Sequence, residues 1–178
     1  MDEKIFSWLP EGLLSCMEKI EVSPRTILLE EGHVADRLYF IERGCLRLFF
    51  YQDGKDVTFQ FFFEDECVAS FDSLYFRRPS LFSLQSIEKS VIRAISRDEF
   101  FRLIYADDRV RRFYEDKLVE RFGAYQQLFL SRIKDTPRQR YEELIRVKPE
   151  IIRRVPLHYV ATYLGITPVS LSRIRGRD

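Results

Sequence analysis

Short apolar runs separated by glycine-containing turns fill the first 106 positions of the chain. After a short helix at about residues 5–20, this pattern predicts strands at residues 26–30, 38–41, 46–51, 57–63, 81–87 and 91–95. The Asp53-Gly54 pair between the third and fourth runs is a strong hairpin signal, and the last two runs are expected to pair across residues 88–90. Strands at such regular spacing predict a jelly-roll β-barrel.

The fourth predicted strand carries a period of two. Val57, Phe59, Phe61 and Phe63 alternate along it, so they are expected to share one buried face, while the opposite face still carries Phe62. Because both faces carry aromatic side chains, we expect a two-layer β-barrel or sandwich.

From residue 107 to residue 134 the apolar period changes to three and four residues, which predicts one long helix. Its apolar stripe is longer than one small barrel needs to cover itself, so part of it is expected to form a coiled-coil-like seam with a second copy of the chain. The alternative is that the stripe packs wholly on its own barrel. The residues expected at the dimer interface are Val110, Phe113, Leu118, Phe122, Tyr125 and Phe129.

A further helix is expected to begin just after residue 135. Thr136 is a suitable N-cap, Pro137 stands at the first helical position, and Gln139 completes a capping box. Asp135 is therefore expected to be the hinge region between the two helices.

Residues 157–175 have the pattern of two short helices that cross at a sharp angle. Leu157, Val160, Ala161 and Leu164 form one apolar face of the first helix, and the small Ala161 lets a second helix approach closely. This spacing is typical of a helix-turn-helix.

The turn between these two helices carries matching signals. Gly165 supplies the positive φ of a left-handed C-terminal cap, Thr167 is an N-cap, and Pro168 follows at the first helical position. Leu171 and Ile174 then form the buried face of the second helix.

The outward residues of the second helix are small, polar or basic, and such residues suit the major groove of DNA. Arg173 is expected to contact a guanine, whereas Arg175 and Arg177 are expected to contact phosphates. One alternative is a helical hairpin with a solvated basic face, and another is a helix-turn-helix that binds protein instead of DNA. The residues expected to bind double-stranded DNA are Thr167, Val169, Ser170, Arg173, Arg175 and Arg177.

Charge is segregated along the chain, although the 178 residues carry a formal net charge of only +1. Residues 1–106 hold 13 Lys or Arg against 18 Asp or Glu, whereas residues 132–178 hold 11 against 5. Because phosphate neutralisation supplies most non-specific affinity for DNA, only the C-terminal part is expected to contact nucleic acid. The expected units are therefore an effector domain (1–106), a dimerisation helix (107–134) and a DNA-binding domain (135–178).

The remaining composition excludes several classes of protein. Cys16, Cys45 and Cys67 are too few and too scattered for a zinc site, a disulfide framework or a four-cysteine iron–sulfur sensor. His33 and His158 do not suit a haem sensor or a metal-dependent barrel enzyme, so we expect no metal, no cofactor and no enzymatic activity. Without a cleavable leader or a run of about eighteen apolar residues, the chain is expected to be cytoplasmic and not membrane-bound.

A barrel, one long helix and a C-terminal helix-turn-helix in this order resemble the Crp/Fnr family of bacterial transcription regulators. The resemblance covers nearly the whole chain and is carried by residues 38–44, 63–66, 70–73, 79–80 and 161–175. It implies an α+β fold with a cyclic-nucleotide-binding-type jelly roll. It also implies a homodimer in which the effector changes how two long helices pack, and so positions two recognition helices on a palindromic operator.

The chain departs from the family pattern at the nucleotide site. In cAMP-binding members a Gly-Glu pair and an Arg-Ser or Arg-Thr pair hold the ribose and the cyclic phosphate, and the aligned positions here are Ala69-Ser70 and Pro79-Ser80. Loss of the carboxylate and the guanidinium removes contacts of about 1.5–3 kcal/mol each. We therefore expect an effector other than cAMP, or none. The candidate effector-site residues are Ser70, Arg77, Arg78 and Ser80.

The DNA-binding part also departs from the pattern. Relatives often begin the recognition helix with an arginine and a glutamate, where this chain has Pro168 and Val169, and only the arginine further along is retained, as Arg173. Because the sequence ends at Asp178, the resemblance predicts a domain that lacks the full β-wing.

Overall fold

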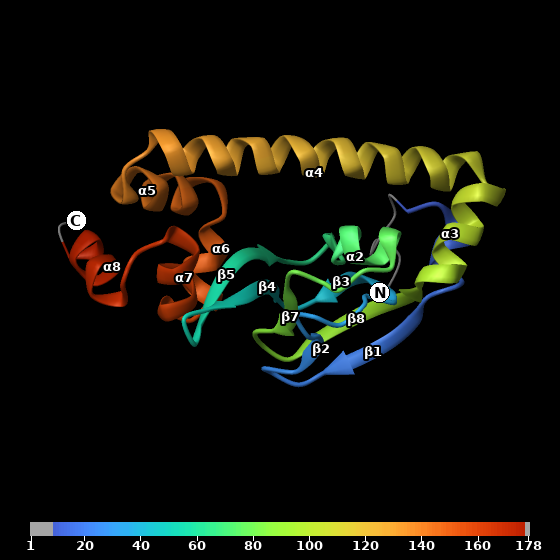
Figure 1. The fold of residues 1–178 in the computed structure, drawn as a ribbon, viewed down its shortest axis with the longest axis horizontal. Coiled ribbons are helices and arrows are strands. Elements are labelled where there is room, and N and C mark those ends of the chain that lie inside the picture. The colour runs from blue at the N-terminus through green and yellow to red at the C-terminus, as the bar shows by residue number, and fades with distance from the viewer. Residues whose placement is uncertain (1–8, 177–178) are drawn as a thin grey trace.

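The computed structural model describes residues 9–176, which form a two-layer β-barrel, one long helix above it and a group of short helices at one end (Figure 1). Every strand pairing is antiparallel, as expected for a jelly roll. One sheet has the order β1 (Glu18–Val22), β8 (Ser90–Ser96), β3 (Arg37–Arg43) and β6 (Cys67–Val68). The other has the order β2 (Ile27–Leu29), β7 (Ser83–Ser86), β4 (Leu46–Gln52) and β5 (Lys55–Phe62).

The hairpin between β4 and β5 is confirmed. Asp53 and Gly54 both have positive φ, 52° and 73°, and this is the backbone that a type I′ turn requires.

The expected pairing of β7 with β8 is wrong, because the two strands lie in different sheets. β7 pairs with β2 and β4, whereas β8 pairs with β1 and β3. Leu84 of β7 and Ile92 of β8 are both buried in the barrel core. The two strands cover that core from opposite sides, so the segment between them crosses from one sheet to the other instead of forming a hairpin turn.

The expected opening helix is also largely wrong. α1 contains only Glu11–Leu14, and residues 18–22 form β1, in which Ile20 pairs with Ile92. Pairing with β8 therefore overrides the local helical period there. Residues 5–8 of the predicted helix lie outside the described residues.

Three helices were not predicted: α2 (Phe71–Phe76), α3 (Arg97–Ala106) and α6 (Pro149–Arg154). The N-cap of α3 is Ser96, whose hydroxyl accepts a hydrogen bond from the Glu99 amide. The Ser96-to-Glu99 spacing is that of a capping box, so the sequence held a signal for this helix.

The later helices begin and end close to the predicted residues. They are α4 (Asp108–Lys134), α5 (Pro137–Val147), α7 (Leu157–Leu164) and α8 (Pro168–Arg175). Both hydrogen bonds of the expected capping box between Thr136 and Gln139 are present at the start of α5. α4 runs the length of the molecule above the barrel, and α5 to α8 gather beneath its C-terminal end (Figure 1).

Consecutive residues of β5 and the segment after it serve two different cores. Phe62 faces the barrel interior, while Phe61 and Phe63 pack against the C-terminal helices. The expectation that Val57, Phe59, Phe61 and Phe63 share one face is wrong for Val57 and Phe59. Leu48 pairs with Gln60 and Phe49 with Thr58, so Phe59 is an extra residue in the strand and the alternation shifts by one position.

Candidate nucleic-acid interface and effector site

The turn between α7 and α8 has the geometry that its sequence predicts. Gly165 has φ 70°, and its amide donates to carbonyls of the last turn of α7. Thr167 caps α8, because its hydroxyl accepts from the Ser170 amide at 3.1 Å. Val160 and Ala161 of α7 and Leu171 of α8 are almost fully buried against each other and their neighbours.

The outward face of α8 brings together part of the expected DNA-binding set. Val169 is 61% exposed, Arg173 lies one turn further on and is also exposed, and Ser170 lies beside them, half-buried. Arg175 is exposed but leaves the helix about 200° away from Arg173. Arg177 lies outside the described residues.

α7 packs on the outer face of the barrel. The Thr58 amide of β5 donates to the Thr162 hydroxyl at 3.2 Å, and the guanidinium of Arg47 lies 3.5 Å from the centre of the Tyr159 ring. These contacts hold the first helix of the pair against the barrel. α8 lies beyond it, at the end of the molecule, with its outward face uncovered (Figure 1).

Arg47 is a fully buried arginine that sequence reasoning missed. Its guanidinium donates to Thr58 at 3.1 Å, to Asp56 at 2.5 Å and to Gln85 at 2.8 Å, so the buried charge is paired and hydrogen-bonded. The only signal was a single charged residue within the apolar run Leu46–Phe50.

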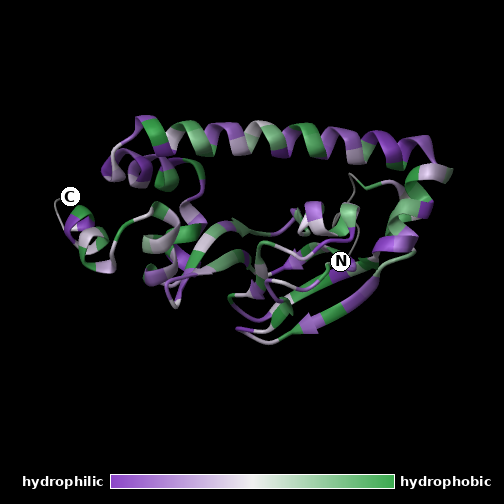
Figure 2. Ribbon diagram, in the orientation of Figure 1, coloured by the Kyte–Doolittle hydropathy of each residue, from purple (hydrophilic) through white to green (hydrophobic). Residues whose placement is uncertain are grey.

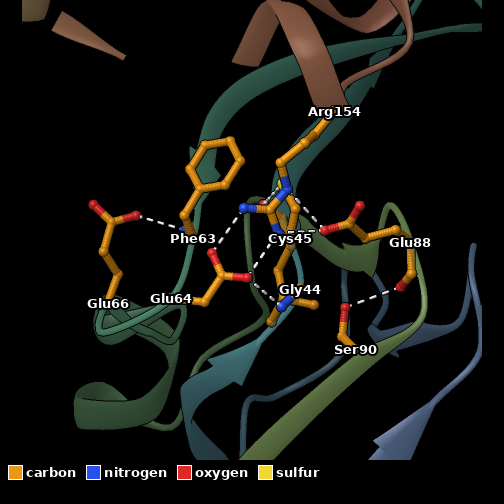
Figure 3. Close-up of polar contacts among 9 residues, drawn as sticks. Gly44, Cys45, Phe63, Glu64, Glu66, Glu88, Ser90 and Arg154 are labelled. Carbon is orange, nitrogen blue, oxygen red and sulfur yellow. Dashed lines mark hydrogen bonds and ion pairs between the residues drawn. The ribbon is translucent and has the colours of Figure 1, made fainter. Parts of the chain in front are cut away.

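A second missed arginine, Arg154 of α6, ties the C-terminal helices to the loops of the barrel (Figure 3). It donates to both carboxylate oxygens of Glu64 at 2.8 Å, and it also bonds Glu88. Glu64 accepts a further bond from the Gly44 amide at 2.7 Å. Partial burial opposes the ionisation of Glu64, but the hydrogen bonds from Arg154 and Gly44 outweigh it and lower the pKa of Glu64 to about 2.

A neighbouring ion pair adds to this connection. Lys148, at the start of α6, lies 2.9 Å from a carboxylate oxygen of Glu66, whose other oxygen accepts from the Phe63 amide at 2.7 Å. Arg154 and Lys148 both contact acidic residues just after β5, so the C-terminal helices are held to the barrel by opposite charges as well as by apolar packing.

The four expected effector-site residues do not converge. The hydroxyl oxygens of Ser70 and Ser80 lie 2.9 Å apart and are both buried. Arg78 instead forms an exposed ion pair with Asp72, and Arg77 is the exposed, left-handed cap that ends α2. Only the two serines therefore meet inside the barrel.

A third arginine that sequence reasoning missed reaches the barrel from α4. Arg121 donates to the Cys67 carbonyl at 2.6 Å. Its guanidinium carbon lies 5.0 Å from the centre of the Phe62 ring and 5.9 Å from that of Phe71. These groups come from β5, β6 and the first residue of α2, and we call this part of the barrel wall the mouth. Ser70 directly precedes Phe71 in the chain.

The expected dimer-interface residues divide into two sets. Val110 is fully buried in the protomer's own core, Phe113 packs against that core, and the Tyr125 ring lies 5.6 Å from that of Phe59. The dimer assignment is wrong for Val110, which has no surface left for a partner. Phe113 and Tyr125 are half-buried and contact the barrel of their own chain. Leu118, Phe122 and Phe129 are exposed, as are Val119, Leu130 and Ile133, so the stripe on α4 is not wholly covered by its own barrel. Hydrophobic and hydrophilic segments alternate along the α4 ribbon (Figure 2).

Comparison with known proteins places this architecture. The sequence profile of the cyclic nucleotide-binding domain matches residues 19–107, which is half of the chain. The chain belongs to the cyclic nucleotide-binding domain family. No curated protein matches it in sequence.

Solved structures of whole regulators share the arrangement of the cyclic nucleotide-binding domain and the helices that follow it. FixK2 from Bradyrhizobium japonicum is 16% identical over 90% of this chain and 83% of its own, with a TM-score of 0.75. A CooA mutant from Carboxydothermus hydrogenoformans is 14% identical over 99% of this chain and 84% of its own, also with a TM-score of 0.75. The c-di-GMP-responsive regulator CLP from Xanthomonas campestris is 17% identical over 94% of this chain and 88% of its own, with a TM-score of 0.75. The expected resemblance to Crp/Fnr proteins is confirmed at the level of the fold.

Two residues expected at the effector site differ from the pattern that the family resemblance gives for cAMP-binding members. Where the resemblance assigns a ribose-binding carboxylate and a phosphate-binding arginine, this chain has Ser70 and Pro79. The Ser70 hydroxyl is hydrogen-bonded to that of Ser80. A proline side chain offers no donor to a phosphate, and a serine cannot supply an anionic acceptor. Arg78, two residues after the end of α2, is paired with Asp72.

Among the described residues, two structural features are absent. Among residues 9–176, no group of three His, Cys, Asp or Glu side chains is placed to hold a metal ion. Within the same residues, no helix is both long and apolar enough to cross a membrane.

Proposed function

We propose that this chain is a homodimeric DNA-binding transcription regulator of the Crp/Fnr type, acting in the cytoplasm, whose effector is not cAMP or is absent. In this proposal residues 1–106 form the effector domain, residues 107–134 the dimerisation helix and residues 135–178 the DNA-binding domain. The observation that carries it is α8: a capped helix at the free end of the molecule whose outward face presents Val169, Ser170 and Arg173.

The chemistry of α8 favours double-stranded DNA as the partner. Val169 and Ser170 are small enough for the helix to approach base edges closely, and Arg173 can donate two hydrogen bonds to a guanine. Arg175, on another side of the helix, is suited to a phosphate, and the same role is proposed for Arg177. Thr167 caps the end of α8 that enters the groove in a helix-turn-helix.

The exposed stripe of α4 supports the homodimer. Val119, Phe122, Gln126, Phe129 and Ile133 follow one another at steps of three, four, three and four residues, which is the heptad spacing of a two-stranded coiled coil. The four apolar members are each about two-thirds exposed or more in the single chain. An isolated protomer would therefore leave these four apolar side chains in water, and a second copy would cover them.

The test is a selection of bound fragments from random double-stranded DNA with the full chain, repeated at about 50 mM and 200 mM salt. We expect an enriched site with two-fold symmetry and an affinity that falls steeply with salt, because each neutralised phosphate releases counterions. Failure to enrich any sequence, together with no salt-dependent affinity, would favour the alternative of a module whose helix-turn-helix binds protein.

A further inference from the structure

The mouth of the barrel contains a set of groups that suits a cation. The Cys67 carbonyl accepts a hydrogen bond from Arg121 at 2.6 Å, and the rings of Phe62 and Phe71 lie 5.0 Å and 5.9 Å from its guanidinium carbon. A carbonyl oxygen and the faces of aromatic rings all present negative potential. The Phe62 ring and Cys67 are both buried, so these groups are already fixed by the packing of the barrel.

The residues that the family resemblance assigns to the cyclic phosphate offer little to an anion. Ser70 and Ser80 bond each other, and Pro79 offers no donor. The nearby Arg78 is engaged with Asp72 at the surface. The arginine at the mouth donates one of its N–H groups to the Cys67 carbonyl, and its guanidinium lies against the Phe62 ring.

A guanidinium matches this mouth better than an ammonium does. It is planar and weakly hydrated, and it can stack on a ring while an edge N–H donates to a carbonyl. The contacts of Arg121 are of these two kinds.

We propose that Arg121 is a built-in occupant of the effector site, and that the site selects a guanidinium-type cation instead of a cyclic phosphate. The guanidinium arrives from α4, the helix that bears the exposed seam, so the barrel holds that helix without a diffusible ligand. The proposal deepens the effector part of the proposed function. Its test measures stability alone, so its failure is distinguishable from a failure to bind DNA.

The experiment is thermal unfolding of the full chain carrying Arg121→Ala, titrated with methylguanidinium chloride from zero to about 20 mM. The matched control is Arg112→Ala, an exposed arginine on the same helix. Removing Arg121 is expected to lower Tm by about 2–4 °C. Methylguanidinium should then recover at least half of that loss in a saturable manner, because a ligand that binds only the folded state raises its stability with concentration.

Two further measurements distinguish binding of methylguanidinium at the vacated site from a general effect of salt. Sodium chloride at equal ionic strength should not recover the Tm of Arg121→Ala, and methylguanidinium should not raise the Tm of the wild type or of Arg112→Ala. At these concentrations the denaturing effect of a guanidinium salt is negligible. An equal response of all three proteins would overturn the proposal.

Arg121→Lys provides the second variant, which retains the charge and should fold even if the alanine variant does not. Its Tm is expected to lie below that of the wild type, because an ammonium cannot stack and donate with the same planar fork. A Tm equal to that of the wild type would show that the mouth requires only a positive charge, and selection of a guanidinium would then be wrong.

Discussion

Arg173 and Arg175 lie two residues apart on α8, yet their side chains leave the helix about 200° apart, so they cannot do the same work. Arg173→Ala is expected to cost about 1–3 kcal/mol of binding free energy and to relax the preference at one base pair in each half-site. Arg175→Ala should instead weaken all sequences about equally and flatten the salt dependence. Both are measured by titration against the selected site and single-base variants of it. An unchanged base preference in Arg173→Ala would contradict the assignment.

Single residues also show where sequence reasoning succeeds and where it fails. Gly165, Thr167 and the Thr136–Gln139 box were predicted, because caps are local signals decided within a few positions of the chain. Arg121 and Arg154 were not, because their partners lie 54 and 90 residues away in sequence. Ser70 and Ser80 do meet, but the adjacent Arg77 and Arg78 turn to solvent, which no local pattern signals.

Among the elements, α6 is attached to the barrel partly through opposite charges. Glu64 has a pKa of about 2 in the folded chain, below its usual value, so its contribution to stability is present above about pH 4.5 and is lost as the pH falls towards 2. Glu64→Gln is expected to lower the free energy of unfolding by about 1 kcal/mol at pH 7, because the pair is only partly buried. Urea unfolding of both proteins from pH 7 to pH 3 should show this difference shrinking. A difference that does not change with pH would show that the charge of Glu64 does not contribute to stability.

The two faces of α4 predict different consequences for the same substitution. Phe122→Glu places a charge in the exposed seam and should shift a dimer towards monomer in sedimentation, since an unpaired buried carboxylate costs several kcal/mol. Tyr125→Glu instead disrupts packing on Phe59 and should lower the stability of the protomer. Sedimentation and thermal unfolding of both variants separate the effects. A wild-type chain that is monomeric at high concentration would remove the basis of the two-fold operator model.

Element boundaries followed the local pattern closely, whereas strand partners did not. The residues that end α4 and start α5, α7 and α8 could be predicted from caps and apolar spacing. The assignment of β7 and β8 to opposite sheets could not, because both strands bury apolar residues in the same core and their sequences do not record from which side. No sequence pattern signals the extra residue at Phe59 either. It shifts the alternation, so residues on its two sides that would share one face of the strand point to opposite faces.

For the molecule as a whole, the barrel predicts a negative result with cyclic nucleotides. Millimolar cAMP or cGMP should leave Tm unchanged, because the carboxylate and the guanidinium that would hold them are replaced by Ser70 and Pro79. A ligand at a hundred times its Kd would stabilise the folded chain by about 2.7 kcal/mol, which a thermal shift would reveal. A clear shift that disappears in Arg78→Ala would show that this arginine leaves Asp72 to bind the phosphate.

The phenylalanines at positions 61, 62 and 63 give the molecule a stiff mechanical connection. Neighbouring side chains of a strand point to opposite sides and move with one backbone, so the wall of the barrel is also the floor of the C-terminal helical group. A tilt or slide of this strand that repacks Phe62 must displace Phe61 and Phe63 by a similar amount. A change of shape inside the barrel is therefore transmitted directly to the residues that pack against α7 and α8. It does not have to pass along the long helix first.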